Sequence, residues 1–523
     1  MKNTKHFLMI VFITMILLIT TTQNSYACSF EEKFEWVKQT FLENDAGVPH
    51  ILERRGLQAL DTHTQMILER IQSAETMREF IWLTHEWLRF FRRHHHQIMQ
   101  NPDLVTTNVV QPVEQVPPVS HPNPGFWDGD IAQFKEYVAT LEDGTNYEGI
   151  WDIDGNYKIG IVREGNSYIG FIIESVFEEW LPNMIKLRID IDGDDVITTF
   201  YVRDFMPVVS GEPTMLGYNL MRMIKPWTIE IKRLEPAFQD NIFVENYFRY
   251  VESTDPFFEQ LNENTMYFRL PLFRVDTTYL DRLIEENISK ITSTENLIID
   301  LRNNPGGSVA YPLLEYLYTN PIISSTSEIN FYATPKNIQL VYNLSQGISL
   351  FSRIRDELKQ FATKLYEKIY DKAGEFVRLS FDDMNRLEFK TEPGPITFDK
   401  VYQYPRNVGI ITNRRTGSAS EAYLFVARQS RKVKIFGETT TGAFDTGFFA
   451  GGGFVESPCG EIWLQYANGI TSFVPDLLFN DIGIQPDFFI DNSVPDYRWV
   501  EHVTEIMSGW VTEPEPRRRR GRR

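Results

Sequence analysis

The sequence predicts an α/β protein with a helical N-terminal region, a small β-barrel or sandwich domain and an α/β core. Three observations lead to this fold class. Apolar residues recur with helical spacing over residues 29–100, short β-type runs separated by Asp-Gly and Gly-Asn turns follow from residue 147, and strand-like and helical runs alternate in the C-terminal half. A chain of 523 residues is long enough for three domains.

We place the domain boundaries at the changes between these patterns. They give a signal peptide at 1–27, a helical region at 28–111, a proline-rich linker at 112–125, a β domain at 126–240, an α/β core at 241–495 and a C-terminal segment with an arginine-rich tail at 496–523.

The first 27 residues have the pattern of a secretory signal peptide. Lys2 and Lys5 precede an apolar stretch at 7–19, and Ser-Tyr-Ala at 25–27 is a small-x-small cleavage site. The apolar stretch is short for a bilayer, so a membrane-spanning helix is disfavoured. We therefore expect export to a periplasmic, secreted or membrane-anchored location.

Cys28 directly follows the expected cleavage site. A bacterial lipoprotein would carry its lipid on such a thiol, but serine stands at position 25, where leucine is usual, so membrane anchoring through Cys28 stays open. Cys459 is the only other cysteine, and the sequence alone does not place the two close enough to assign a disulfide.

The helical region is predicted by an apolar face that includes Phe34, Val37 and Phe41 and continues to Phe91. Five prolines between 112 and 124 then predict an extended linker, because proline fixes φ and removes a hydrogen-bond donor.

Five short strands are expected in the β domain, at 147–151, 157–163, 167–173, 185–191 and 196–202. The acidic run at 190–195 is better read as a hairpin turn than as a calcium loop, because Asp195 and Tyr201 stand where an EF-hand loop needs glycine and glutamate. The domain could bind a peptide at an exposed strand edge or serve only as a spacer.

In the core, strands are expected at 266–270, 296–300, 408–411 and 433–436, and helices at 310–318 and 419–428. A further helix at 352–373 carries one apolar face. It is either a lid or a packed insertion helix.

Ser418 is the candidate nucleophile. It lies in T-G-S-A-S-E-A, after an apolar strand and at the start of a predicted helix, where backbone N–H groups can stabilise an oxyanion. The alternative is that Ser418 or Ser420 only caps the helix, with Glu421 completing a capping box for Ser418.

A second segment, D-L-R-N-N-P-G-G at 300–307, runs from a strand into Gly306 and Gly307. Glycines let a backbone approach a ligand closely and direct its N–H groups at that ligand. An oxyanion hole is therefore plausible here.

These segments, followed by F-G-E-T-T-T-G at 436–442 and G-I-Q-P-D at 483–487, resemble the C-terminal-processing (tail-specific) serine peptidases over residues 266–490. The resemblance implies a crotonase-like spiral peptidase core. It also implies Ser418 as nucleophile and Ala419 with Gly306 and Gly307 as oxyanion donors. Ala443 stands where the lysine-dependent branch has its base, so the tricorn-like branch, which uses a histidine, fits better.

That histidine is expected at His95. Residues 90–98 resemble the F-F-R-x-G-H-x-x-I segment of such peptidases, with His94 where glycine is usual. An imidazole can accept the serine proton near neutral pH. His94 or His96 as the base, a metal-binding tract and a basic patch remain alternatives, although three consecutive histidines chelate one ion poorly.

The base also needs an orienting group that holds one tautomer. The resemblance implies a glutamate three residues before Gly483, where this chain has Asn480 followed by Asp481. Either side chain could position a hydrogen bond. For Glu421, the other nearby carboxylate, a charge at a helix N-terminus is the favoured role.

Together these observations predict an exported serine endopeptidase that acts on proteins or peptides through an acyl-enzyme, with no metal or organic cofactor. The net charge of −19 argues against a nucleic-acid partner. The alternative is a catalytically weak or inactive binding protein of the same fold that recognises peptides or envelope polymers. The missing lysine and Asn480 favour that alternative.

Overall fold

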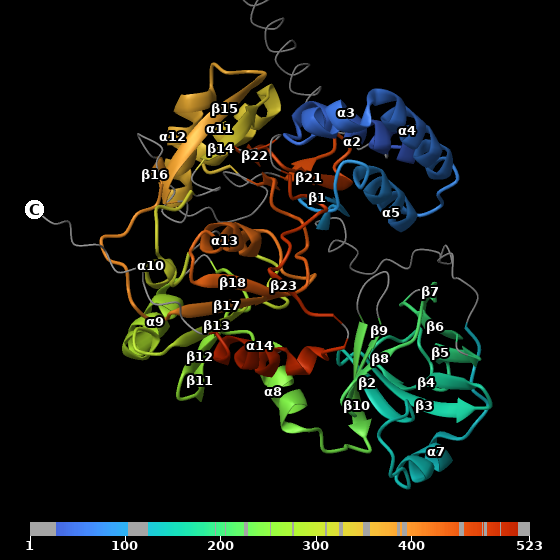
Figure 1. Cartoon of the computed structure of the whole chain (residues 1–523). Coiled ribbons are helices and arrows are strands. Elements are labelled where there is room, and N and C mark those ends of the chain that lie inside the picture. Colours follow the sequence, from blue (N-terminus) through green and yellow to red (C-terminus); the bar gives the residue numbers. More distant parts are fainter. Residues whose placement is uncertain are drawn as a thin grey trace, which may run out of the picture. The chain divides into compact units, whose positions relative to one another are not determined.

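The structure is a computed structural model that describes residues 28–102, 124–193, 195–203, 205–223, 229–251, 253–274, 277–308, 311–323, 328–348, 356–383, 388–389, 395–448, 454–472, 474, 478–491 and 493–510 (Figure 1). The expected signal peptide, most of the proline-rich linker and the arginine-rich tail lie outside the described residues. None of the described helices is both long and apolar enough to cross a membrane.

The chain forms two compact units, each built from separate stretches of sequence. The first unit takes its residues from Met1–Pro112, Ser324–Gly394 and Gly442–Ile482, and the second takes them from Val113–Ile323, Pro395–Thr441 and Gly483–Arg523.

The first unit begins with four helices, α2 (Phe30–Asn44), α3 (Val48–Arg55), α4 (Leu57–Ile71) and α5 (Met77–Leu88). Capping boxes start α2 at Ser29 and α5 at Thr76, where each side chain accepts the N–H of a glutamate three residues on. The apolar face expected from the sequence is buried, and Phe34 and Phe41 pack edge-on against Trp87.

Two antiparallel sheets complete the first unit. One has the order β1-β21-β20, and the other has the order β16-β15-β14-β22-β19. Their strands are β1 (His96–Gln100), β14 (Glu328–Ala333), β15 (Glu375–Asp383), β16 (Glu388–Phe389), β19 (Thr446–Gly447), β20 (Phe454–Glu456), β21 (Ile462–Tyr466) and β22 (Gly469–Thr471).

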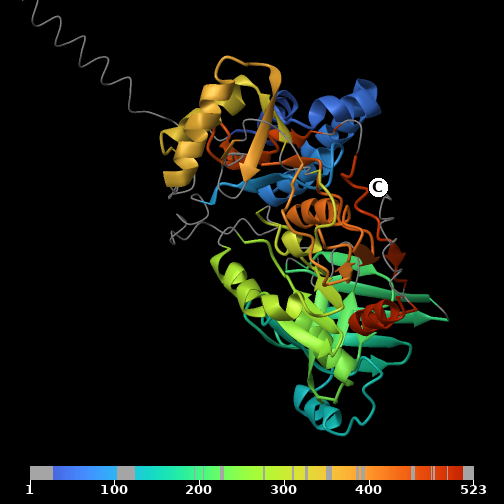
Figure 2. The same cartoon turned by 60° about the vertical axis from the view of Figure 1, so that its left-hand side comes forward.

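Two helices, α11 (Pro335–Ser345) and α12 (Asp356–Ile369), lie beside β14 and β15 in both views (Figure 1 and Figure 2). The apolar face expected for α12 is buried in a cluster through Phe361, Leu365 and Ile369. The sequence left open whether this helix is a lid or a packed insertion helix, and its burial matches the packed insertion helix.

The second unit contains a nine-stranded antiparallel sheet with the order β7-β6-β5-β4-β3-β2-β10-β9-β8. Its strands are β2 (Gly149–Ile153), β3 (Tyr157–Glu164), β4 (Ser167–Ser175), β5 (Ile185–Asp192), β6 (Asp195–Tyr201), β7 (Pro207–Ser210), β8 (Thr214–Leu216), β9 (Leu220–Met223) and β10 (Ile229–Glu235). Helix α7 (Ile131–Val138) packs Phe134 against Phe171 of the sheet. The acidic run ends β5 and starts β6, so it is a hairpin turn.

A six-stranded sheet with the order β11-β12-β13-β17-β18-β23 forms the core of the second unit. Only the β11–β12 pair is antiparallel. The strands are β11 (Phe257–Asn262), β12 (Thr265–Arg269), β13 (Asn296–Asp300), β17 (Asn407–Thr412), β18 (Val433–Gly437) and β23 (Phe488–Phe489). Strands β12 and β13 are buried throughout, as is usual for parallel strands covered on both faces.

Helices cover this sheet on both faces, with α13 (Ala419–Ala427) and α14 (Trp499–Ser508) on opposite sides (Figure 1). The other helices of this part are α8 (Ile242–Val251), α9 (Thr278–Ile291), α10 (Leu314–Leu317) and the short 3-10 helix η1 (Asp496–Arg498). The helix expected at 310–318 is shorter than predicted, because Leu313 has a φ of +65° and α10 starts only after it.

The parallel pairing of β13 with β17 determines where the motifs meet. Asp300 pairs with Ile411, so the loops that follow the two strands leave the same edge of the sheet. The mixed α/β architecture, with N-terminal helices, a β-rich part and a largely parallel core sheet, confirms the predicted fold class.

Candidate active site

Ser418 occupies a strained turn between β17 and α13. Its φ is +53° and its ψ is −117°, a backbone conformation that non-glycine residues rarely adopt. Such strain costs on the order of 1–3 kcal/mol and persists where the surrounding structure enforces it. A serine on a strained strand-to-helix turn is also the arrangement that exposes the nucleophile in α/β-hydrolases.

Contacts from two loops hold this turn. The Gly417 N–H donates to the Asn304 carbonyl (3.0 Å), and the Ser420 hydroxyl donates to the same oxygen (3.1 Å). Ser420 is fully buried, whereas Ser418 is only half-buried. Ser420 therefore fastens the two loops together, and Ser418 is the serine that a substrate could reach.

Glu421 supports the capping role expected for this turn. Its carboxylate accepts the Ser418 N–H (2.9 Å), as a capping residue would, and it also accepts the Thr440 hydroxyl. Through the backbone N–H of Ser418, Glu421 caps the start of α13.

Gly306 and Gly307 have φ values of +110° and +118°, and neither has room for a side chain. A Cβ on Gly306 would lie 2.7 Å from the Ala419 nitrogen and 2.7 Å from the Ser418 Cβ. A Cβ on Gly307 would lie 2.0 Å from the Phe273 carbonyl oxygen. Glycine is required at position 306 because the loop lies directly against the Ser418 turn, and at position 307 because the loop lies against the Phe273 backbone.

The two glycines differ in what their N–H groups do. The Gly306 N–H donates to Asn304 Oδ1 (3.0 Å), so it is already engaged. The N–H groups of Gly307 and Ala419 have no acceptor among the residues that the structure describes. Of the three donors expected from the sequence, Gly307 and Ala419 are therefore the pair free to bind an oxyanion.

The loop that carries these glycines is anchored by a buried ion pair. Arg302 donates from Nη2 to Asp300 Oδ2 (2.6 Å), and Tyr267 donates its hydroxyl to the same oxygen (2.9 Å). Burial would raise the pKa of the Asp300 carboxyl, but the charges of Arg302 and Arg269 hold that pKa below its ordinary value. Asp300 and Arg302 therefore fix the start of the loop, a role that the sequence analysis did not assign.

His95 lies in the first unit, in the loop between α5 and β1, and has a φ of +58°. Arg92 shapes this loop. Its buried guanidinium pairs with Asp45 through both nitrogens (2.7 and 2.5 Å) and donates to the carbonyls of His94 (2.9 Å) and His95 (2.8 Å). An ion pair without exposure to water thus fixes the backbone that carries the candidate base.

The side chain of Thr446 links Asn480 to His95. His95 Nδ1 is 3.3 Å from Thr446 Oγ1, and Asn480 Nδ2 donates to that oxygen (3.4 Å). Asn480 Oδ1 in turn accepts the N–H groups of Phe444 and Asp445, both at 3.0 Å. Thr446 is a candidate orienting residue that no motif in the sequence indicated.

A hydrogen bond to the Thr446 backbone raises the pKa of His95. Desolvation, followed by the charges of Arg92 and His94, nevertheless lowers the pKa of His95 to about 3. The imidazole is therefore neutral near pH 7, but it is a weak base.

The neighbouring histidines have other surroundings. His96 is buried, and its Nε2 is 2.7 Å from the Arg92 carbonyl, with its ring edge-on to Phe41. His94 is half-buried, and the nearby Asp481 charge opposes the desolvation that lowers the pKa of His94. Asp481 also accepts the Arg93 N–H (3.1 Å), so it holds the start of the histidine loop.

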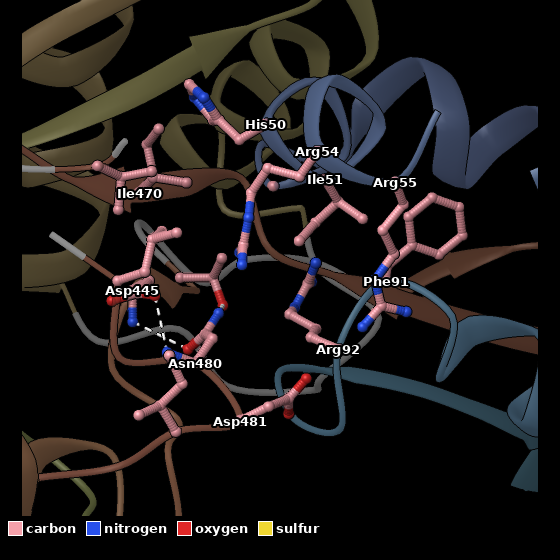
Figure 3. Close-up of a pocket in the computed structure, with 15 residues that line it drawn as sticks. His50, Ile51, Arg54, Arg55, Phe91, Arg92, Asp445, Ile470, Asn480 and Asp481 are labelled. Atoms are coloured by element: carbon pink, nitrogen blue, oxygen red, sulfur yellow. Dashed lines mark hydrogen bonds between the residues drawn. The ribbon is translucent and has the colours of Figure 1, made fainter. Parts of the chain in front are cut away.

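A pocket of about 340 Å³ adjoins this network in the first unit. Figure 3 shows Asp445 and Asn480 joined by hydrogen bonds on one side of it, with Arg54 and Arg55 reaching in from α3. The remaining lining is largely apolar and includes Ile51, Phe91, Ile470, Val474, Leu478 and Ile482.

A second pocket, of about 300 Å³, belongs to the second unit. Leu270, Phe273 and Tyr279 contribute to its lining. Phe273 donates its N–H to the Gly306 carbonyl (2.9 Å), so this pocket adjoins the glycine loop. Among the residues that the structure describes, no group of three or more His, Cys, Asp or Glu side chains is placed to hold a metal ion.

The candidate residues thus form two groups. Ser418, Ala419, Gly306 and Gly307 lie together in the second unit, and His95, Asn480 and Asp481 lie together in the first. The pairing of His95 with Ser418 stays a prediction.

Comparison with known proteins agrees with the motifs. The model of peptidase family S41 matches residues 264–447, about a third of the chain. No curated protein matches the sequence.

Similar solved structures include a lipoprotein from Streptococcus agalactiae (12% identity, 92% of this chain, 97% of that chain, TM-score 0.37). They also include mature CPAF complexed with lactacystin (11% identity, 92% and 97%, TM-score 0.47) and a photosystem II D1 C-terminal processing protease (13% identity, 90% and 94%, TM-score 0.34).

The matched region contains the Asp300–Gly307 loop and the Ser418 turn, the two segments that carried the resemblance in the sequence. Residues 264–447 are therefore similar to peptidase family S41, in agreement with the resemblance that the motifs predicted.

Proposed function

We propose that this protein is an exported serine endopeptidase that cleaves peptide bonds through an acyl-enzyme. The observation that carries the proposal is the strained backbone of Ser418 beside two backbone N–H groups, those of Gly307 and Ala419, that are free to bind an oxyanion. Preorganised donors of this kind stabilise the charge that develops in acyl transfer.

In this mechanism Ser418 Oγ attacks the scissile carbonyl while His95 Nε2 accepts the hydroxyl proton. The carbonyl oxygen becomes the oxyanion that Gly307 and Ala419 bind. His95 then gives the proton to the leaving amine, and water hydrolyses the acyl-enzyme by the same steps in reverse order. This route uses no metal or organic cofactor.

We assign the orientation of the His95 imidazole to Thr446 and Asn480. The Thr446 hydroxyl lies beside Nδ1 of His95 and is held by Asn480, but neither residue brings a negative charge to the imidazole. Desolvation has lowered the pKa of His95 to about 3, so forming the imidazolium costs more than in a triad with a carboxylate. We therefore expect a slower enzyme than a full Ser-His-carboxylate triad would give.

We assign proteins or peptides as substrates, and the pocket lined by Leu270, Phe273 and Tyr279 to an apolar substrate side chain. Its position next to the glycine loop supports this assignment, because a side chain adjacent to the scissile bond would lie close to the oxyanion donors.

The second candidate function is a catalytically weak or inactive binding protein that recognises peptides or envelope polymers. Asn480 and the lowered pKa of His95 favour it specifically, because both remove driving force from proton transfer. The two functions differ in whether Ser418 can be acylated.

Fluorophosphonate labelling separates them. The native protein should be labelled on one serine, and Ser418→Ala should abolish both the labelling and the cleavage of casein. Ser420→Ala is the matched control. It removes one buried hydrogen bond, at a cost of about 1 kcal/mol, and should leave the labelling intact. Labelling that persists in Ser418→Ala would disprove the nucleophile, whereas a native protein that is never labelled would support the binding protein.

A further inference from the structure

The two cysteines of the chain lie 431 positions apart in the sequence, yet they meet in the first unit. Cys28 stands just before α2, and Cys459 lies in the turn between β20 and β21. Lys33 Nζ bridges the Cys28 carbonyl and Glu461, two residues after Cys459, and the two thiols lie close enough for each to change the pKa of the other. Both cysteines are half-buried, within reach of a soluble reagent.

Neighbouring contacts hold both cysteine backbones in place. Lys33, whose side chain is only 3% exposed, donates from Nζ to the Cys28 carbonyl and pairs with Glu461 (2.9 Å). Ser29 caps α2 directly after Cys28. The turn that carries Cys459 is closed by the Gly460 N–H, which donates to the Ser457 carbonyl (2.8 Å). The contact between the thiols is therefore built into the fold on both sides.

We propose that Cys28 and Cys459 form a disulfide in the exported protein, which fastens the start of α2 to the β20–β21 turn. Such a bond excludes a thioether-linked lipid on Cys28, because the same sulfur cannot carry both. The proposal thus decides between the two states that the sequence left open for Cys28.

The reaction needs an oxidant, and a small-molecule or protein disulfide supplies it. The Cys459 thiolate attacks one sulfur of that disulfide and releases the first thiol. The Cys28 thiolate then attacks the Cys459 sulfur of the mixed disulfide and releases the second thiol. The two cysteines give two electrons to the oxidant, which leaves as two thiolates, and the two protons that the cysteines lose are balanced by those that convert these thiolates to thiols.

The acidities of the thiols agree with this order. Burial opposes ionisation of Cys459, but hydrogen bonds from Cys28 and Ser457 lower the pKa of Cys459 below its ordinary value. Desolvation and the bond to Cys459 raise the pKa of Cys28 to about 11. Cys459 is therefore the better first nucleophile.

The disulfide would restrain the sheet β1-β21-β20, whose strand β1 begins directly after His95. β21 is the central strand of the order β1-β21-β20, and its Tyr466 pairs with His96, the residue after His95. A link from α2 to the turn before β21 joins the first helix of the unit to this sheet, and so limits how far the two can separate on unfolding.

The disulfide can be tested on purified full-length protein. The protein is first reduced and then, in its folded state, equilibrated in a buffer with equal concentrations of oxidised and reduced glutathione. After acid quenching and alkylation, peptide mapping should find Cys28 linked to Cys459, and intact mass should show the loss of two hydrogen atoms. The same protein in guanidinium chloride should contain almost no Cys28–Cys459 link, and its cysteines should be free or joined to glutathione, because the folded contact is lost.

Two variants serve as controls. Cys28→Ser and Cys459→Ser should each leave one alkylatable thiol, and Lys33→Met should reduce the fraction of linked peptide severalfold, because it removes the contacts to the Cys28 carbonyl and Glu461. A folded protein in which both thiols are alkylated at this glutathione ratio would overturn the proposal. So would protein recovered after export with a lipid on Cys28 and a free thiol at Cys459. None of these readouts depends on peptidase activity.

Discussion

Gly306→Ala tests the oxyanion geometry most directly. The new Cβ would lie 2.7 Å from both the Ala419 nitrogen and the Ser418 Cβ, and 2.8 Å from the Gly417 carbonyl oxygen. Carbon atoms do not approach backbone atoms this closely, so the glycine loop must move away from the Ser418 turn. The φ of +110° adds strain on the order of 1–3 kcal/mol.

The movement should separate the N–H groups of Gly307 and Ala419. Loss of one oxyanion donor typically lowers kcat by about 10²–10³-fold, or about 3–4 kcal/mol of transition-state stabilisation. Because the displaced groups bind the transition state, kcat should fall far more than KM changes. The assay is steady-state cleavage of a peptide substrate, with urea unfolding measured in parallel.

Gly374→Ala provides the matched control. Gly374 has a φ of +89°, so alanine there is strained in a similar way, but its Cβ would meet no atom within 4 Å. This variant should lose stability and keep its kcat. A folded Gly306→Ala enzyme with a kcat within a few fold of the native value would refute the assignment of this loop to the oxyanion hole.

Two further predictions concern the histidine loop. Thr446→Val removes the hydroxyl between His95 and Asn480, and it should lower kcat by about 10²-fold with little change in KM. The control is Thr439→Val, which loses only an exposed contact to Gln485 and should have no such effect. Equal activity in both variants would contradict the orienting role of Thr446. Acid should also destabilise the fold. His95 and His96 have pKa values of about 3 in the folded protein and ordinary values near 6.5 when unfolded, so the unfolded chain binds more protons between these limits. The free energy of unfolding is therefore highest above pH 6.5, where both imidazoles are neutral, and it falls as the pH decreases toward 3. The urea midpoint should decrease over the same range. A midpoint independent of pH between 6.5 and 4 would show that the two imidazoles are not desolvated as the structure indicates.

Local sequence was sufficient for the candidate nucleophile and its loop. The T-G-S-A-S-E turn and the two glycines lie next to buried strands, and the spacing of apolar residues identifies those strands without tertiary information. The order of the motifs then indicated the peptidase family, in agreement with the family match over residues 264–447.

Tertiary structure decided which groups are free to act. Nothing in the sequence distinguishes the N–H of Gly306 from that of Gly307, because the difference depends on the Asn304 side chain folding back onto Gly306. In the same way, the pairing of Arg92 with Asp45 and the contact of His95 with Thr446 join residues 47 and 351 positions apart.

The physical reason is that periodicity and turn chemistry report on neighbours within a few residues. Hydrogen bonds and desolvation, in contrast, depend on groups brought together from distant parts of the chain. Sequence therefore determined which residues could perform the chemistry, and only the fold determined the protonation, the orientation and the unpaired donors on which that chemistry depends.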